Sequence, residues 1–445
     1  MAVTYFVPLL RVQNLLHLRT EMAKKDKLSK IFQKETSMDK SNELFKNMDH
    51  NPVSVITQAN KDLVSSIKEK LEGISSLKSI FRVPEKLIEA NEKVYVPRTV
   101  SIGPLHHGKE ILNYMEDRKW HYLFTLFNRQ LNLEASLNEC VNAVRDLEKT
   151  ARNFYEQELN LTSNKFIEMM LIDGCFIIEL FLKRALKNVR RRGDPIFATP
   201  GMLNNVRCDL ILLENQIPLP ILQRLFTIVT VPIKCDLNLP ELAIHFFTNM
   251  LPGGKEIISE KFSQEGHHLL DLIRQCYLPT FARVQSKKRV SLHDVIERAT
   301  KLRKDGIKFK SFTAKSLLDI KFANGVLVVA PLPIHQFTEL LFSNLIAFEQ
   351  HQNDRRPFTS YALLMKAMLC NENDVKLFRH QRILIIDNYT EKEVCDLFKR
   401  LCGQMKHAED NFYFARLLEQ ILEYKSQRSW KRILKCSCLK ILSST

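Results

Sequence analysis

The feature that most constrains the fold is an apolar run that extends from Phe166 to Leu182. The run is nearly long enough to cross a bilayer, but it contains three acids, Glu168, Asp173 and Glu179. Because a helix that spans a membrane needs about 20 mostly apolar residues with few charges, this run predicts a core helix of a globular domain. Since an unpaired carboxylate is costly in an apolar core, we expect Asp173 and Glu179 to pair with basic or amide groups of neighbouring segments.

Most of the remaining chain also shows helical spacing of its apolar residues, and the pattern changes only near Gly306. Residues 307–312 alternate between apolar and polar, and Asn324-Gly325 separates two further short runs of strand character. An Asn-Gly pair between such runs is the strongest local signal for a β-hairpin. The sequence therefore predicts a mainly α fold: a multi-helix globular domain with a small antiparallel β-hairpin or three-stranded meander near residues 306–331.

Composition and charge narrow the class of protein. With 45% hydrophobic and 26% charged residues, the 445-residue chain has the proportions of a folded globular protein. Its ten cysteines form no CxxC pair, which indicates free thiols in a reducing compartment. The formal net charge of +16 favours acidic partners. Because the basic residues lack aromatic interleaving and known nucleic-acid motifs, no nucleic acid is expected as a partner.

The C-terminal segment from Tyr424 to Thr445 has six basic residues and no acidic one. On a helical wheel its apolar side chains, among them Trp430 and Cys438, gather on one side. The opposite side carries Arg428, Lys431, Arg432 and Lys435. This pattern is typical of a helix that lies on an anionic membrane without spanning it, and Cys436 and Cys438 are placed for reversible palmitoylation. The competing interpretation is a frayed, solvated C-terminus.

The pair His106-His107 lies in a loop with Gly and Pro and is the most tempting candidate for metal chemistry. A zinc site needs three or four converging ligands, but adjacent residues of a loop point in different directions. The other Cys and His residues show no matching spacing. We therefore expect no metal and no cofactor, and we interpret both histidines as structural residues that satisfy backbone groups.

Three other groups of polar residues interrupt apolar stretches. They are Asp173 with Glu179, Glu214-Asn215-Gln216, and Glu349-Gln350. The two acids of the first group are separated by about 240° around their helix, so they form a poor catalytic pair. The second group predicts either a buried polar network or the lip of a binding site, and the network is favoured because its members can satisfy one another. The third group has the same two interpretations.

Signatures of catalysis are missing from the sequence. It contains no G-x-S-x-G elbow, no P-loop and no G-x-G-x-x-G, and its 12 glycines leave few loops that could cradle phosphate. We therefore expect a protein that is not an enzyme. The alternative is an unrecognised hydrolase or transferase that assembles a buried Cys/His/acid site from distant segments.

Five separated blocks of sequence together resemble one known family. The blocks are Phe81–Pro84 with Tyr95–Gly108, Met115-Glu116 and Lys119-Trp120, then Met169–Phe181, Asp209–Pro218, Gly306–Phe309 with Leu318–Ile320, and Asn344–Gln350. In this order they are specific for the plant domain-of-unknown-function family 247, also catalogued as uncharacterised protein family 0481. The resemblance extends from about residue 55 to about residue 425.

The resemblance also indicates how the chain is organised and where it works. Residues 1–50 form a variable extension, residues 51–423 the family domain, and residues 424–445 the basic amphipathic tail. Family members commonly have one transmembrane helix after the domain, which is not visible here, so the implied location is membrane-associated or otherwise cytoplasmic. Some grass members look like determinants of self-incompatibility. The resemblance therefore implies a non-enzymatic recognition or scaffold protein with an unknown protein partner and, through its tail, a possible anionic membrane surface.

Overall fold

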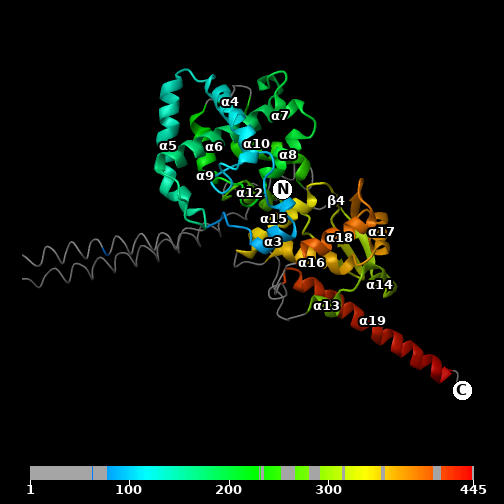
Figure 1. The fold of residues 1–445 in the computed structure, drawn as a ribbon. Helices are drawn as coiled ribbons and strands as arrows, with labels where there is room; N and C mark the ends of the chain where they lie inside the picture. The colour runs from blue at the N-terminus through cyan, green and yellow to red at the C-terminus, as the bar shows by residue number, and fades with distance from the viewer. Residues whose placement is uncertain are drawn as a thin grey trace, which may run out of the picture. The chain divides into compact units, whose positions relative to one another are not determined.

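The computed structural model divides the chain into two compact units, Met1–Glu72 and Gly73–Thr445. The structure describes Leu63 and residues 78–229, 231, 235–251, 266–279, 291–312, 316–351, 356–403 and 412–442, with side chains in the last helix as far as Arg428. The predicted extension over residues 1–50 lies outside the described residues. All elements that carry a label in Figure 1 belong to the second unit.

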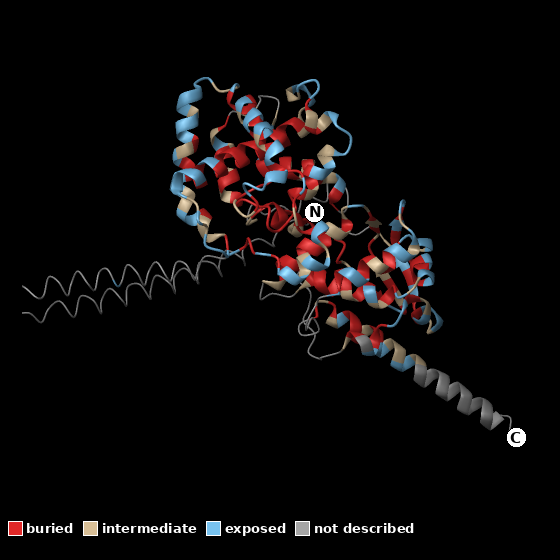
Figure 2. Cartoon of the chain, viewed as in Figure 1, coloured by how far each residue is buried: buried red, intermediate tan, exposed pale blue. Residues whose placement is uncertain are grey.

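The first part of the second unit is a group of helices around one buried helix. These helices are α3 (Glu85–Ala90), η1 (Glu92–Val94), η2 (Glu110–Met115), α4 (Glu116–Phe127), α5 (Leu133–Asn153), α6 (Ser163–Ala185), η3 (Lys187–Val189), α7 (Pro195–Ala198), α8 (Met202–Asp209), α9 (Leu219–Ile228), α10 (Leu239–Phe247), η4 (Thr248–Met250) and α12 (Leu269–Tyr277). Apart from Glu168, α6 is buried from Phe166 to Lys183, and α4, α5, α9 and α10 pack against it. Figure 2 shows this buried centre and the exposed outer side of α5. The prediction of a core helix is confirmed.

The close packing of α6 against α9 depends on Gly174. A Cβ atom at this position would overlap the side chain of Leu225 in α9. Glycine inside a helix lowers its stability by about 1 kcal/mol relative to alanine. The gain from bringing two apolar helices together accounts for a glycine at this buried position.

The second part of the unit combines helices with two small sheets. Its elements are α13 (Leu292–Val295), α14 (Ala299–Lys304), β1 (Lys308–Ser311), β2 (Lys321–Ala323), β3 (Val326–Val329), β4 (Leu332–Ile334), α15 (Thr338–Gln350), α16 (Pro357–Met368), α17 (Glu372–His380), β5 (Leu384–Ile386), α18 (Glu391–Leu401) and α19 (Ala415–Leu442). Several helices begin at side-chain caps, and α18 has a complete capping box between Thr390 and Glu393. The mainly α fold with a minor sheet is confirmed.

The predicted hairpin is formed by β2 and β3. Asn324 and Gly325 have φ values of 50° and 78°, as a tight turn between twisted strands requires, and the two strands pair antiparallel. The third strand differs from a meander, because β1 pairs with β3 in parallel and the strand order is β1-β3-β2. The sheet is therefore mixed, since the connection from β1 to β2 carries the chain past β3.

A second sheet pairs β4 with β5 in parallel, Leu332 opposite Leu384. The sequence predicted helix at β5, and that prediction is wrong for Leu384–Ile386 because three residues are too few to show a period of two. In β4, Pro333 has no N–H to offer a neighbouring strand, and β4 pairs on one side only.

Helix α19 is continuous from Ala415 to Leu442, so the predicted boundary between domain and tail at residue 424 falls inside one helix. Its first turns are buried through Leu417, Leu418 and Ile421. Figure 1 shows the helix leaving the rest of the unit toward the C-terminus. Among the described residues, no helix is both long and apolar enough to cross a membrane.

Candidate functional site

The loop from Tyr95 to Gly108, which carries the histidine pair, is held in the core by side-chain oxygens from other segments. Asp209 accepts hydrogen bonds from the amides of three successive residues, Arg98, Thr99 and Val100. Asn215 Oδ1 accepts from the Ile102 amide at 2.7 Å, and Asp173 Oδ2 accepts from the Gly103 amide at 2.8 Å. Burial raises the pKa of Asp209 to about 6 despite its amide donors. The loop is thus a fixed part of the core.

His106 and His107 point in different directions, as predicted. His106 is buried with its Nε2 atom 3.3 Å from Glu214 Oε2, whereas His107 is exposed. The neighbour of His106 is thus a carboxylate and not the backbone group that was predicted. Burial lowers the pKa of His106, although Glu214 opposes the shift. Glu214 also accepts from the Val83 amide at 2.7 Å and from Arg82 Nη1 at 2.8 Å. Among the described residues, no three Cys, His, Asp or Glu side chains converge on a point where a metal could bind.

Asp173 pairs with a lysine that is buried as completely as the acid. Lys119 Nζ lies 2.7 Å from Asp173 Oδ1 and 2.8 Å from Glu116 Oε1. Burial alone would lower the pKa of Lys119, but the two carboxylates outweigh it and raise this pKa. Asp173 is therefore paired with a basic or amide group of neighbouring segments, as predicted: with Lys119 of α4 and with the Gly103 amide.

Glu179 belongs to a separate cluster on another side of α6. It forms a two-point ion pair with Arg129, and Lys183 Nζ lies 4.0 Å from its Oε1. Lys183 also contacts Asp194 at 2.8 Å and lies over the Tyr122 ring at 3.6 Å. The two acids of α6 each have a partner, and they do not face one another, as predicted.

Asn215 and Gln216 belong to a buried polar network rather than an exposed lip, and Glu349 is buried and bonded separately, at the start of α16. Asn215 Nδ2 donates to the carbonyls of Val100 and Asp209. Gln216 Nε2 donates to two further carbonyls at 2.8 Å, and Gln216 Oε1 accepts from the Leu270 amide. Glu349 accepts from the backbone amides that begin α16, and burial raises its pKa to about 7. Gln350 is half-buried, and among the described residues its side chain bonds within its own helix.

Asp209, Asn344 and Lys119 also belong to this network, although the sequence had not singled them out. Asn344 Oδ1 accepts from the Leu213 amide at 2.8 Å, and its Nδ2 donates to the Val94 carbonyl at 2.6 Å. All three residues lie inside or beside the sequence blocks quoted above. A polar residue at the edge of such a block was the signal that could have found them.

The tail begins with residues that contact the core. Lys425 Nζ donates to the Val295 carbonyl at 2.9 Å, and Arg428 Nη1 contacts the Tyr424 hydroxyl at 3.2 Å. The guanidinium of Arg428 also covers Gly306 closely enough that a Cβ atom there would overlap it. The side chains of the other candidate membrane residues lie outside the described residues: Trp430, Lys431, Arg432, Lys435, Cys436 and Cys438.

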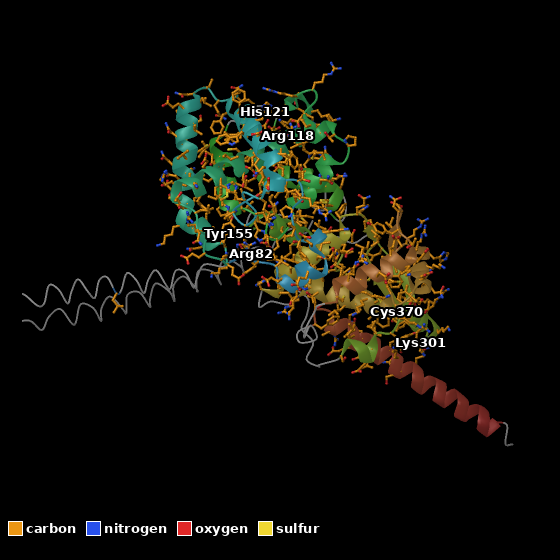
Figure 3. The ribbon with its side chains drawn as sticks, viewed as in Figure 1. Arg82, Arg118, His121, Tyr155, Lys301 and Cys370 are labelled. Atoms are coloured by element: carbon orange, nitrogen blue, oxygen red, sulfur yellow. The ribbon has the colours of Figure 1, made fainter. Side chains whose placement is uncertain are left out.

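The largest group of exposed apolar side chains was not anticipated from the sequence. Among the described residues, most of the large apolar side chains that are exposed fall between positions 111 and 137: Ile111, Tyr114, Trp120, Phe124, Leu131, Leu133 and Leu137. We call the four that lie on η2 and α4 the outer strip: Ile111, Tyr114, Trp120 and Phe124. Arg118 and His121 lie on the same helix (Figure 3), and Arg191 Nη1 is 3.5 Å from His121 Nε2.

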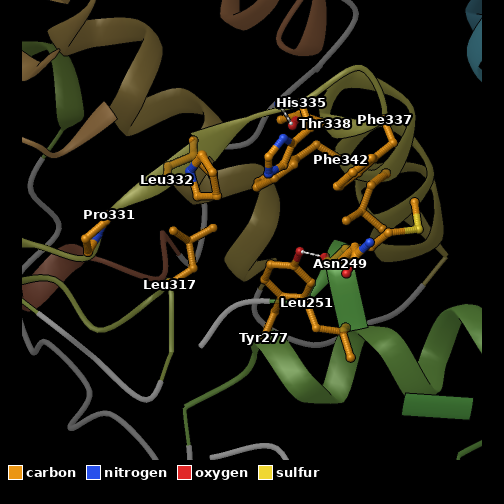
Figure 4. A pocket seen from close by; sticks show the side chains of 13 residues that line it. Asn249, Leu251, Tyr277, Leu317, Pro331, Leu332, His335, Phe337, Thr338 and Phe342 are labelled. Carbon is orange, nitrogen blue, oxygen red and sulfur yellow. Dashed lines mark hydrogen bonds between the residues drawn. The ribbon is translucent and has the colours of Figure 1, made fainter. Parts of the chain in front are cut away.

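A small hollow lies between the end of α12 and the start of α15 (Figure 4). It encloses roughly 490 Å³, including its open mouth, and is lined mainly by apolar side chains, with His335 and Thr338 among the polar ones. Thr338 Oγ1 accepts from the His335 amide, and the Tyr277 hydroxyl donates to the Met250 carbonyl. Two of its polar groups are therefore already bonded within the fold, and the hollow offers few directional contacts to a ligand.

Fold and surface together define a class: a mainly α domain whose described buried acids are bonded within the core, and whose exposed apolar residues gather largely along η2 and α4. The family model "Plant protein of unknown function" (DUF247) matches residues 80–441. The "UPF0481 protein At3g47200" of Arabidopsis thaliana is 32% identical over 368 residues, 78% of this chain and 76% of that protein. The "Putative UPF0481 protein At3g02645" of the same plant is 21% identical over 456 residues, 79% and 83% of the two chains. No solved structure matches the chain significantly. The chain therefore belongs to this plant family of unknown function, as the resemblance predicted.

Proposed function

We propose that this protein is a non-enzymatic recognition or scaffold protein that works at a membrane surface. The observation that carries the proposal is the outer strip. Large apolar patches on a folded domain mark sites of interaction, and Trp, Tyr and Arg are the residues that contribute most binding energy in protein interfaces. The strip combines Tyr114, Trp120 and Phe124 with the neighbouring Arg118.

The buried polar groups support the same proposal. Asp173, Glu179 and Glu214 are each bonded to a basic group of the fold, and Asp209 and Glu349 are bonded to backbone amides. These acids hold loops and helix ends in place, and this structural role accounts for their burial. Recognition, including recognition of the self-incompatibility type, needs only such a rigid scaffold and an exposed surface.

The test is proximity labelling in plant cells with the full chain. The double variant Trp120→Ser/Phe124→Ser should lose most of the proteins that wild type labels. The matched control is Ile385→Ser, because Ile385 is 45% exposed, close to the 48% of Trp120, but belongs to β5. If the double variant and the control label the same proteins as wild type, the proposed function is wrong.

We also propose that the tail attaches the protein to anionic membranes without spanning them. Of its six basic residues, Lys425 and Arg428 already contact the core, which leaves 6 − 2 = 4 for lipid. At about 1 kcal/mol for each basic residue near an anionic leaflet, these supply roughly 4 kcal/mol. Palmitoylation of Cys436 or Cys438 would add the second signal that stable attachment needs.

Flotation with vesicles of phosphatidylcholine and phosphatidylserine tests the attachment. The full chain should float at low salt and be released as salt rises, because exposed charges are screened. Deletion of residues 429–445 should abolish flotation and leave the docked Lys425 and Arg428 in place. A full chain that stays in the soluble fraction at low salt, with or without acylation, would contradict membrane attachment.

A further inference from the structure

The outer strip consists of two exposed apolar pairs that follow one another along η2 and α4 on the surface of the second unit. Ile111 and Tyr114 are three residues apart in a 3-10 helix and so lie on one side of it, and Trp120 and Phe124 are four apart on one side of α4. From Ile111 to Phe124 the two helices extend over roughly 20 Å, at about 2.0 Å per residue in η2 and 1.5 Å in α4. This is about the length of four helical turns.

A basic flank lies beside the outer strip. It consists of Arg118 and His121 of α4, together with Arg191 and Arg192 of the loop that follows η3. Within the described residues, no salt bridge joins Arg118, Arg191 or Arg192 to an acid, although the carboxylate of Asp117 lies next to Arg118 in sequence. His121 and Arg191 contact each other, and the exposed acid Asp117 lies four residues before His121 on the same side of α4. The three arginines outnumber this one acid, so the flank presents a net positive charge to a partner.

The outer strip and the tail face different surroundings. Figure 1 places α4 and α5 at one end of the unit and the C-terminal end of α19 at the other. If α19 attaches the protein to a bilayer, as proposed above, then the outer strip lies away from that bilayer and a protein is the partner within its reach. This step rests on the proposed function.

We propose that the outer strip binds an acidic segment of a protein partner. Apolar side chains of the segment cover Trp120 and Phe124, which are 48% and 53% exposed, and its Asp or Glu carboxylates face Arg118 and Arg191. The apolar contact provides most of the affinity. The charges select for an acidic sequence and speed up association, which salt slows.

Selection from a library of random displayed peptides tests the proposal directly. The full chain is the bait, and peptides that also bind the Trp120→Ser/Phe124→Ser variant are removed. Recovered peptides should combine aromatic or Leu residues with Asp and Glu. Arg118→Glu/Arg191→Glu should weaken a synthetic copy of such a peptide by about tenfold or more, whereas Ile385→Ser should bind as wild type does. Thermal melts check that each variant is folded.

Each other outcome overturns the proposal in an identifiable way. The selection could recover peptides without an acidic bias, or no peptide that distinguishes wild type from the Trp120→Ser/Phe124→Ser variant. Either result would show that the strip does not bind acidic segments. The chain that lacks residues 429–445 could still float with vesicles and lose this binding when Trp120→Ser/Phe124→Ser is added. That result would show that the strip binds lipid. A dimer in light scattering that the same variant dissociates would make it a contact between copies. In all three cases proximity labelling still decides the proposed function separately.

Discussion

At the scale of single residues, most of the buried acids singled out in this domain join segments that are distant in sequence. That Asp173 and Glu179 would be paired could be predicted, because an apolar helix cannot hold free carboxylates. Their partners, Lys119 and Arg129, could not be named in advance. Which basic residue reaches an acid depends on how α4 packs on α6, and local sequence does not encode that packing.

Removing one member of the buried pair should be more harmful than removing both. Asp173→Ala leaves Lys119 with Glu116 as its remaining acid and frees the Gly103 amide, so we expect the free energy of unfolding to fall by about 3–5 kcal/mol. The double variant Asp173→Ala/Lys119→Met should recover a substantial part of this loss. Urea denaturation measures both, and equal losses in the single and double variants would contradict a paired role for Lys119.

His268 predicts how stability depends on pH. Its Nδ1 accepts from the Asp271 amide and its Nε2 contacts the Ser79 carbonyl, and burial lowers its pKa from 6.5 to about 4. The unfolded chain therefore binds more protons between these values. The stability due to neutral His268 is complete above about pH 6.5 and is lost as pH falls through about 4, on the order of 3 kcal/mol.

The measurement is thermal or urea unfolding at a series of pH values between 7 and about 4. His268→Asn keeps an N-cap acceptor for α12 but removes the titration, so its stability should fall less steeply with acid. His107→Asn changes an exposed histidine and serves as the control. Parallel curves for wild type and His268→Asn would refute the assignment.

At the scale of elements, the sequence predicted the turn but did not predict how the strands pair. Asn324-Gly325 specified the hairpin because both residues adopt positive φ in the turn. Alternation in residues 307–312 indicated a strand but carried no information on its neighbour, and β1 pairs with β3 in parallel. The direction of pairing depends on the path of the connection between strands, and that path is set by tertiary packing.

Gly325→Val tests the turn. Valine resists positive φ, and a Cβ atom at this position would overlap the hydroxyl of Tyr424, so we expect a loss of more than about 1 kcal/mol in thermal or urea unfolding. Adding Tyr424→Ala should relieve the overlap and leave only the backbone strain. Asn324→Gly is the control and should be tolerated. An unchanged melt for Gly325→Val would exclude the turn.

At the scale of the whole unit, the helical part and the sheet-containing part meet at Asn344. This α15 side chain bonds the Leu213 amide and the Val94 carbonyl, and both lie in the helical part. Asn344→Ala leaves two buried backbone groups without partners, so stability should fall by about 2–3 kcal/mol. Hydrogen exchange at Leu213 should also accelerate.

The control for this junction is Gln350→Ala. Its side chain is half-buried and, within the described part of the chain, bonds the Ile346 carbonyl of its own helix at 3.4 Å. It should change stability by less than about 0.5 kcal/mol. A protected Leu213 amide in Asn344→Ala, at unchanged stability, would contradict the junction.

The exposed surface was less predictable from the sequence than the buried polar network. The buried network could be anticipated in kind from polar residues inside apolar blocks. The outer strip could not be anticipated, because Trp and Phe are residue types that usually lie in a core. Trp120 and Phe124 are exposed because of the orientation of α4. An exposed apolar residue is visible in sequence only after the buried side of its helix is known.

The continuity of α19 also has a mechanical consequence. About 14 residues follow Arg428 within the same helix, so a load applied at its far end acts on a stiff lever of roughly 20 Å. The first contacts to feel such a load are Arg428 over Gly306 and Tyr424 beside the Gly325 turn. Tension on the C-terminus would therefore be delivered to the small mixed sheet before it reaches the helices around α6.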